Sequence, residues 1–350
     1  MILRHYTLTR LLKREAASAA AGRRWVRTGT RAVEWTPGSA HNRFREWRSS
    51  AAVGNRKYQI RKSTLFCSED APEVLYLPAI SSVSSFHEFA DCAQLLVDRF
   101  NVTSLDWPGF GESDRPPQPV SRELLLEFVE SMLATPGQRL RPIHVIAGGH
   151  AGCYVLRALR QHNYLRARVA SVAMLCPTWK APLVSALESH ASRRSLSTAL
   201  RLLQAFPSLG SLLFRSFASE SAIRKQYEAH VFESPSSVSE ELLLDKWRLA
   251  QHPNAHWGAW AYILGNLDLH HTRAEFLTDA KLVGDSGMPI VCMAGRRSPP
   301  RTAAEMRALC DLEAVRKVEV PGALLPQEEY PEPVAKALAT WIEEQDAMIA

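Results

Sequence analysis

The 350-residue sequence predicts an α/β fold, in which a mostly parallel sheet is flanked by helices and carries a helical cap insertion. Three observations predict this fold. Short apolar runs recur along the chain, segments with helical spacing separate them, and one long helical stretch interrupts the alternation. A strand that is apolar throughout is expected where helices cover both faces of a parallel sheet.

The apolar runs are the expected strands, and helical spacing fills most of the intervals between them. In chain order, the expected strands are a hairpin at 47–62 and runs at 74–77, 102–105, 143–147, 169–175, 290–294 and 317–320. The stretch 182–287 has helical patterns without a convincing strand, and we expect it to form a cap over the carboxyl edge of the sheet. This divides the core into a first part at 46–181 and a second part at 288–350.

Charge is distributed unevenly along the chain. The formal net charge is +6, from 42 Lys and Arg and 36 Asp and Glu. Residues 1–62 hold 15 of these bases and 3 of the acids, a net +12, so residues 63–350 carry a net −6. The basic balance therefore belongs to the N-terminal segment, and we expect no nucleic-acid partner for the globular part.

Residues 1–45 have the composition of an organelle import presequence. The first 33 residues contain seven Arg and one Lys but a single acid, Glu15. Arg-rich, acid-poor segments are typical of such presequences, whereas Arg4 and Arg10 would interrupt the apolar core of a secretory signal. We expect an organelle location, with the chloroplast favoured and the mitochondrion as the alternative. A basic tail that binds an acidic partner is the other interpretation, and a bacterial source would favour the cytoplasm.

Membrane-spanning and metal-binding classes are both disfavoured by the sequence. No apolar run approaches the roughly 18 residues that a membrane span needs. The six cysteines are scattered without the spacing of a disulfide framework or a zinc site. We therefore expect a soluble protein with reduced thiols, no metal ion and no cofactor.

Three motifs of the sequence resemble those of one known superfamily. The run Asp106–Pro116 reads DWPGFGESDRP and resembles the loop D-x-P-G-F-G-x-S-D-x-P of the α/β-hydrolase superfamily. The run Gly148–Gly152 reads GGHAG and, between an expected strand and helix, resembles the nucleophile elbow. The closing run 320–331 reads VPGALLPQEEYP and is similar to the last strand and loop. With the LPAISSVSS run at 77–85, the elbow also resembles a cyanobacterial and chloroplast branch with His in place of the nucleophile serine.

The resemblance implies positions for a Ser-His-Asp triad, and the expected residues are missing from them. In the elbow pattern G-x-S-x-G, the glycine positions fall on Gly148 and Gly152, which places His150 at the nucleophile position. The loop 296–299 reads RRSP and holds no acid, and no His follows His271. We expect a catalytically degenerate protein that binds a small apolar or amphipathic molecule or a protein partner, because fold and function are separable.

His150 leaves a second interpretation open. An imidazole at the floor of a pocket could act as a general base, oriented by Glu328 or Glu329 from the closing loop. The protein would then be an active enzyme of unconventional mechanism, either a hydrolase or a cofactor-free lyase. The alternative is an imidazole that only lines or caps a degenerate pocket.

The remaining expected site residues line an oxyanion region or a pocket mouth. They are Ala79, Ile80, Ser81, Trp107, Ala151 and Trp179. The amides of Ile80 and Ala151 could still donate to a bound oxygen, because a backbone donor does not depend on the side chain. The serines at 81–85 could instead cap the following helix, and the two tryptophans could be core residues.

Overall fold

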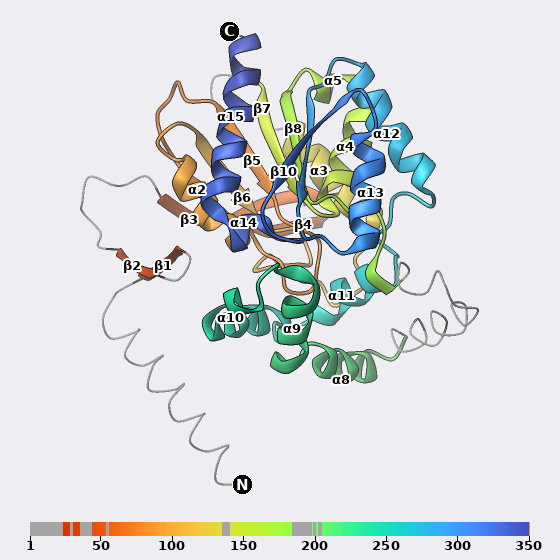
Figure 1. The fold of residues 1–350 in the computed structure, drawn as a ribbon. Coiled ribbons are helices and arrows are strands. Elements are labelled where there is room, and N and C mark those ends of the chain that lie inside the picture. The colour runs from red at the N-terminus through yellow and green to blue at the C-terminus, as the bar shows by residue number, and fades with distance from the viewer. Residues whose placement is uncertain are drawn as a thin grey trace.

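An eight-stranded sheet forms the centre of the protein, as the computed structural model shows (Figure 1). The described residues are 24–28, 31–35, 44–53, 56–134, 141–183, 198, 201 and 205–349. Within them the strand order is β10-β9-β8-β7-β5-β6-β4-β3. Neighbouring strands from β6 through β5 to β10 are parallel, and β4 and β3 add an antiparallel edge. The predicted mostly parallel sheet is therefore confirmed.

The strands follow the apolar runs of the sequence closely. They are β3 (Phe44–Val53), β4 (Arg56–Leu65), β5 (Glu73–Leu77), β6 (Asn101–Leu105), β7 (Ile143–Gly148), β8 (Val169–Leu175), β9 (Ile290–Gly295) and β10 (Val315–Val320). Every residue of β7 and β8 is buried, which explains why these central strands lack polar alternation. Exposed and buried residues instead mix along β4, near the sheet edge.

A separate two-stranded ribbon lies within the predicted N-terminal segment. It consists of β1 (Arg24–Thr28) and β2 (Arg31–Trp35), which pair antiparallel. Most of the segment 1–45 lies outside the described residues, and so does the predicted presequence at its start.

Helices cover both faces of the large sheet. They are α2 (Ala90–Leu96), α3 (Arg122–Ala134), α4 (Ala151–Gln161), α5 (Asn163–Arg166), α12 (Arg273–Asp285), α13 (Pro300–Cys310) and α15 (Pro331–Ile349). Residues of α2 and α15 share one core cluster with one face of the sheet, whereas α3, α4, α12 and α13 contribute to a second cluster. The sheet is therefore the middle of three layers.

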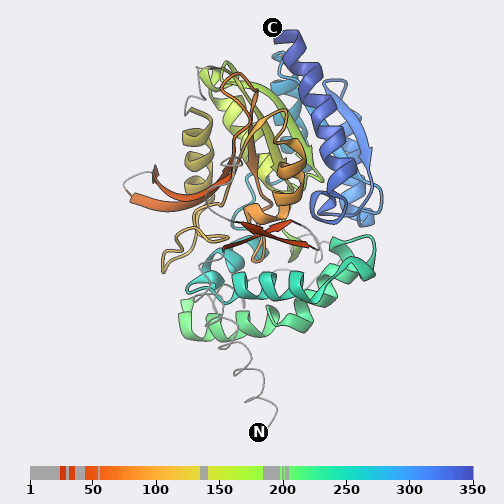
Figure 2. The same ribbon diagram turned by 90° about the vertical axis from the view of Figure 1, so that its left-hand side faces the viewer.

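A helical cap lies across the carboxyl edge of the parallel strands, below the sheet in Figures 1 and 2. It comprises α8 (Pro207–Phe217), α9 (Glu220–Gln226), η3 (Tyr227–Val231), η4 (Pro235–Ser237), α10 (Glu240–Ala250) and α11 (Ala255–Ile263). The predicted cap range 182–287 also includes α12, but that helix packs against α4 beside the sheet. Of the described helices, none is both long and apolar enough to cross a membrane.

Candidate functional site

The turn between β7 and α4 corresponds to the nucleophile elbow, and its geometry moves the apex by one residue. In this fold the nucleophile occupies a strained turn between a strand and a helix. The left-handed residue here is Gly149, with φ +49°, whereas His150 has ordinary helical angles of φ −67° and ψ −20°. The expectation that His150 takes the nucleophile position is therefore wrong, because the backbone assigns that position to Gly149, which has no side chain.

The elbow is held by the two loops that flank it. The amide of Gly149 donates to the carbonyl of Leu175 at 2.9 Å, and its carbonyl accepts from the amide of Thr178 at 3.3 Å. On the other side, a Cβ added to Gly149 would lie 3.3 Å from the Cβ of Ala79, and one added to Gly148 would lie 3.0 Å from the amide nitrogen of Ala79. Both glycines therefore allow the loop after β5 to pack directly on the elbow.

The shift of the apex also changes the expected oxyanion donors. Ala151 is the first residue of α4, and its amide was expected to follow the nucleophile position. With the apex at Gly149, the amide that follows is that of His150. Ala79 packs closely against the elbow glycines. Ile80 follows it, and the side chain of Ile80 is buried. The role of the Ile80 amide stays a prediction.

His150 is fully buried and both of its ring nitrogens are engaged. Nε2 lies 3.0 Å from Oδ1 of Asp268, and Nδ1 lies 3.2 Å from the hydroxyl of Thr178. A carboxylate only accepts, so Nε2 carries a proton. In the neutral imidazole, Nδ1 then accepts the hydroxyl proton of Thr178. The carboxylate of Asp268 is held in turn by the amide of Ala181 at 3.1 Å. This network ties the elbow to the loops after β8 and α11.

The expected orientation of His150 by Glu328 or Glu329 is wrong, because both carboxylates bind the cap instead. Oε1 of Glu328 lies 2.7 Å from Nζ of Lys246. The carboxylate of Glu329 accepts from the amides of Glu233 at 2.7 Å and Ser234 at 2.8 Å.

The closing loop carries leucines where the resemblance implies the catalytic His. The amide of Leu324 donates to the carbonyl of Val231 at 2.9 Å. Leu325 is buried in an apolar cluster with residues of the cap, among them Tyr227 and Leu243. The loop therefore packs against the cap through its backbone and its apolar side chains.

A buried polar cluster lies beside the elbow, between the sheet and the cap. We call it the Lys246 cluster, and its members are Tyr76, Glu88, Tyr227, Lys246, Gln327 and Glu328. Oε1 of Glu88 accepts from the Tyr76 hydroxyl at 2.7 Å and from the Ala79 amide at 2.9 Å. A Cβ on Gly148 would lie 3.4 Å from the Tyr76 hydroxyl and 3.6 Å from Oε1 of Glu88, so the cluster adjoins the elbow.

Burial shapes the electrostatics of this cluster. It raises the pKa of Glu88 from 4.5 to about 7, because desolvation disfavours the carboxylate, although Lys246 opposes the shift. Burial also disfavours the ammonium of Lys246, but Glu328, Tyr227 and Glu88 outweigh it and raise the pKa of Lys246. The ammonium lies 5.8 Å from the ring centroid of Tyr227, a cation–π contact. At neutral pH the cluster thus combines the ammonium of Lys246 with a Glu88 carboxyl group whose pKa is raised to about 7.

Four oxygens of the cluster have no hydrogen-bond partner among the described residues. They are Oε2 of Glu88, the hydroxyl oxygen of Tyr227, Oε1 of Gln327 and Oε2 of Glu328. A buried polar atom without a partner costs roughly 1–3 kcal/mol, so such atoms are usually satisfied by water or by a ligand. A water molecule or a ligand group that donates hydrogen bonds would satisfy the acceptors among these atoms.

The two expected pocket tryptophans pack in the interior. The indole nitrogen of Trp107 donates to the carbonyl of Pro78 at 2.8 Å, and its ring centroid lies 5.7 Å from that of Phe128. The indole nitrogen of Trp179 donates to Glu305 at 2.8 Å. Both side chains are buried, which favours the core interpretation over a pocket mouth.

The serines after β5 stabilise local turns. The hydroxyl of Ser81 accepts from the amides of Val83 at 3.3 Å and Ser84 at 3.1 Å. Ser85 is the N-cap of η1 (Phe86–Phe89) and accepts from the amide of His87 at 3.3 Å. The capping interpretation is therefore confirmed for Ser85, and the Ser81 hydroxyl is occupied by its own turn.

The sequence interpretation missed Glu88 and Lys246 in the cluster, and also Asp268 and Thr178, which contact His150. One signal was available for Lys246, because Leu242, Lys246 and Leu249 recur at helical spacing and so share a buried face of α10. A lysine inside an apolar stripe indicates a buried partner. Glu88 stands between Phe86 and Phe89 in a short 3₁₀ turn, and nothing in its neighbours marks it as buried.

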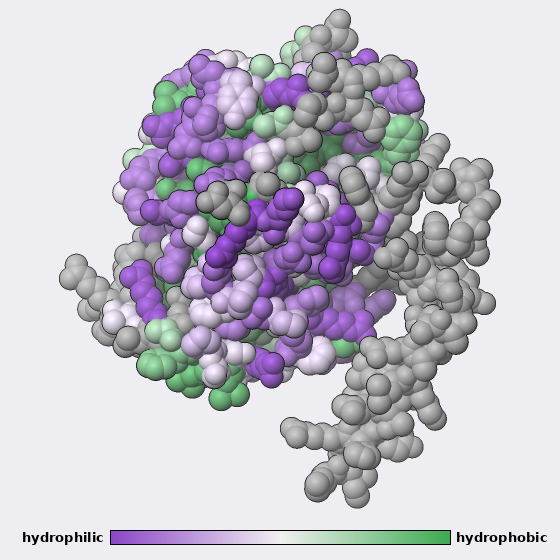
Figure 3. All heavy atoms as spheres, turned by 180° about the vertical axis from the view of Figure 1, so that it is seen from behind, coloured by the Kyte–Doolittle hydropathy of each residue, from purple (hydrophilic) through white to green (hydrophobic). Residues whose placement is uncertain are grey.

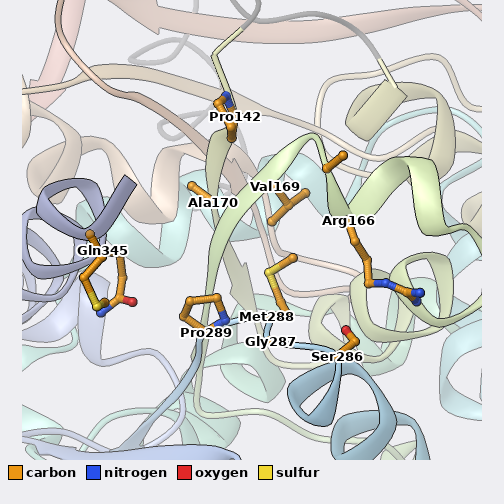
Figure 4. A pocket seen from close by; sticks show the side chains of 11 residues that line it. Pro142, Arg166, Val169, Ala170, Ser286, Gly287, Met288, Pro289 and Gln345 are labelled. Carbon is orange, nitrogen blue, oxygen red and sulfur yellow. The ribbon is translucent and has the colours of Figure 1, made fainter. Parts of the chain in front are cut away.

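A cavity of about 440 Å³ opens at the opposite edge of the sheet (Figure 4). Pro142, Val169 and Pro289, at the starts of β7, β8 and β9, line it. Ligands of open α/β sheets bind at the carboxyl ends of the strands, so this cavity does not belong to the elbow. In the part of the chain that the structure describes, no group of three or more His, Cys, Asp or Glu residues could hold a metal ion.

The comparisons with known proteins agree with this geometry. The sequence matches the Alpha/beta hydrolase family over residues 74–337. Among curated proteins, none matches the chain. Solved structures with the same fold include a haloalkane dehalogenase from Agrobacterium tumefaciens C58, with 17% identity, a TM-score of 0.63 and coverage of 88% of this chain and 100% of that one.

Two further structures have similar scores. An enol-lactonase from Burkholderia xenovorans LB400 has 16% identity and a TM-score of 0.61 and covers 84% of this chain and 100% of its own. A thermophilic esterase from Thermogutta terrifontis has 16% identity and a TM-score of 0.60, with 85% and 99% covered. At such identities the likeness concerns the fold alone. Since the family match spans most of the sequence, the chain belongs to the alpha/beta hydrolase family.

Proposed function

We propose that the protein is a non-hydrolytic member of its family that binds a small amphipathic ligand. The observation that carries the proposal is the elbow apex, where the backbone conformation of a nucleophile falls on Gly149. A covalent mechanism needs a nucleophilic side chain next to a base. Leu324 and Leu325 stand where that base is expected, and Leu325 packs against the cap.

The Lys246 cluster supports the polar part of this ligand. Of its four unpartnered oxygens, those on Glu88, Gln327 and Glu328 are acceptors when the carboxyl groups are ionised, and the Tyr227 hydroxyl can donate as well as accept. A ligand with ammonium, hydroxyl or amide donors would satisfy them. The adjoining apolar cluster, which includes Phe232 and Leu242, would hold its apolar part.

A fluorophosphonate probe tests the absence of serine-hydrolase chemistry. We expect no labelling of the full-length protein, while an active serine esterase in the same sample is labelled fully. Ester, amide and epoxide substrates should likewise show no turnover. Stoichiometric labelling of this chain would overturn the proposal.

Ligand binding is tested by mass spectrometry of small molecules that copurify with the native protein, followed by thermal unfolding with the candidate added. The variant Glu88→Gln replaces an unpartnered acceptor by a donor, so it should retain less ligand and lose the thermal stabilisation. Glu130→Gln is a matched control, because Glu130 pairs with His162 on the surface. Equal retention by both variants would place the ligand away from the cluster.

One observation favours the second candidate function, an enzyme with His150 as base. The Asp268 carboxylate lies 3.0 Å from Nε2, an arrangement that orients and stabilises an imidazolium. The hydroxyl of Thr178 occupies the other nitrogen, so proton transfer would require this contact to open. Turnover that disappears in His150→Ala and persists in Ser82→Ala would support this candidate, whereas turnover retained in His150→Ala would exclude it.

We also propose that the basic N-terminal segment directs import into an organelle, with the chloroplast favoured. The excess of Arg over acids in the first 33 residues supports this proposal. N-terminal sequencing of the native protein tests it. A mature chain that begins downstream of this segment is expected, and one that still begins at Met1 would favour a permanent basic tail.

A further inference from the structure

Four large hydrophobic side chains gather on the solvent side of the cap. They are Phe206, Leu209, Leu212 and Phe217, which are 63%, 43%, 63% and 58% exposed. The other large hydrophobic side chains that are exposed in the described part of the chain are scattered over several elements. Figure 3 shows hydrophobic spheres gathered at the lower edge of the molecule, where the cap lies. We call these four residues the cap patch.

Helix α8 is anchored on one side and presents Leu209 and Leu212 on the other, whereas the exposed ring of Phe217 also contacts Trp260 edge-on, with the ring centroids 5.8 Å apart. The indole nitrogen of Trp260 in α11 donates to the carbonyl of Gly210 at 3.0 Å, and the Trp260 ring contacts Phe214 edge-on. Gly210 and Phe214 are the buried residues of the helix. Leu209 and Leu212 are three residues apart on the outward side, so they lie next to each other.

The segment of sequence that carries the patch is basic, and the first acid after it is the exposed Glu220. The 31 residues from Ser189 to Ser219 contain four Arg and no Asp or Glu, although the globular part as a whole is mildly acidic. Arg201 and Arg215 are exposed. Apolar side chains beside basic ones, without acids, are the composition of a helix that lies in the interface of an anionic membrane.

We propose that the cap patch docks on the surface of a membrane that contains anionic lipids, with the apolar side chains among the acyl chains and the arginines at the headgroups. A second copy of the chain fits less well. A two-fold contact would bring the same patch of two molecules together and oppose Arg to Arg. The proposal is independent of the chemistry at the elbow, because it uses only the outer side of the cap.

Vesicle flotation of the full-length protein tests this surface. The vesicles are phosphatidylcholine alone or phosphatidylcholine with phosphatidylserine. We expect binding to the anionic vesicles and weak binding to the neutral ones. Leu212→Glu should lower the partition coefficient about tenfold or more, because inserting one leucine contributes about 1.5–3 kcal/mol and 1.4 kcal/mol is a factor of ten.

The matched control is Met348→Glu. Met348 is 71% exposed near the end of α15, at the far side of the molecule from the cap (Figure 1). Both variants change the net charge equally, so the basic N-terminal segment contributes the same attraction to each. At about 1 M salt the Debye length is about 3 Å and that attraction is screened. The difference between the variants should persist there.

Arg215→Gln provides a second measurement with little risk to folding. It should weaken binding to anionic vesicles about fivefold, from about 1 kcal/mol per basic residue, and leave binding to neutral vesicles unchanged. Equal binding by Leu212→Glu and Met348→Glu would overturn the proposal. So would sedimentation data in which the wild-type protein is a dimer and Leu212→Glu is a monomer, because a second copy would then cover the patch.

Discussion

Replacing Glu88 by Gln should stabilise the protein at alkaline pH. The pKa of Glu88 is raised from 4.5 to about 7 by burial in the Lys246 cluster. An acid whose pKa is higher in the folded protein holds its proton longer there than in the unfolded chain. The contribution of protonated Glu88 to the unfolding free energy is therefore complete below about pH 4.5, and it is lost progressively as the pH rises towards 7. Glutamine keeps the acceptor for Tyr76 and Ala79 but cannot ionise.

The magnitude follows from the shift of the pKa. One pKa unit corresponds to about 1.4 kcal/mol, so a shift of this size costs the wild-type protein about 3 kcal/mol above pH 7. Between pH 5 and pH 8, the unfolding free energy of Glu88→Gln minus that of the wild type should rise by about 2–3 kcal/mol. Burial also raises the pKa of Asp106 to about 7, but that residue is present in both proteins and cancels in the difference.

Urea unfolding at several pH values measures this difference. Glu112→Gln is a control of opposite sign, because a hydrogen bond from His87 lowers the pKa of Glu112. The ionised Glu112 therefore stabilises the folded protein at pH values above its unfolded pKa. At pH 8, Glu112→Gln should have a lower unfolding free energy than the wild type. If Glu88→Gln and the wild type showed parallel pH profiles, Glu88 would be ionised normally and the electrostatic account of the cluster would fail.

Two further predictions concern the elbow and the cluster. Lys246→Met should lower the unfolding free energy by about 3–5 kcal/mol, because it leaves a buried carboxylate uncompensated, and adding Glu328→Gln should recover most of the loss. A double-mutant cycle by chemical denaturation measures the coupling, and additive effects would exclude a buried ion pair. Gly149→Ala should cost about 1–2 kcal/mol because of its left-handed backbone. Gly152→Ala should lower the stability less, because an added Cβ would contact only the flexible side chain of Met174. Thermal unfolding of both variants measures the difference, and a larger loss of stability in Gly152→Ala than in Gly149→Ala would contradict the assigned apex.

The sheet was predictable because its central strands are buried on both faces. Runs such as 143–147 and 169–175 are apolar without interruption, and their order along the chain requires crossover helices. The elbow motif located the right turn but not the right residue. Two glycines four apart satisfied the pattern around His150, and only the backbone angle of Gly149 distinguishes the two registers.

The side-chain network of the site was less accessible from the sequence. Asp268 is separated from His150 by 118 positions, and its loop has no pattern that points to the elbow. The partners of Glu328 and Glu329 lie in the cap, whose docking on the closing loop depends on the tertiary fold. Local periodicity carries no information on such pairs, because it reports only which face of an element is buried.

The attachment of the cap to the closing loop affects how fast a molecule can move between the solvent and the buried Lys246 cluster. The closing loop contacts the cap through Leu324, Glu328 and Glu329. A further hydrogen bond of 2.9 Å runs from the amide of Gly322 to the carboxylate of Glu233. A molecule that reaches the buried cluster must wait until several of these bonds open together, which is a local unfolding event and not a side-chain rotation. Association and dissociation should therefore both be slow, and a bound molecule could survive purification even at modest affinity.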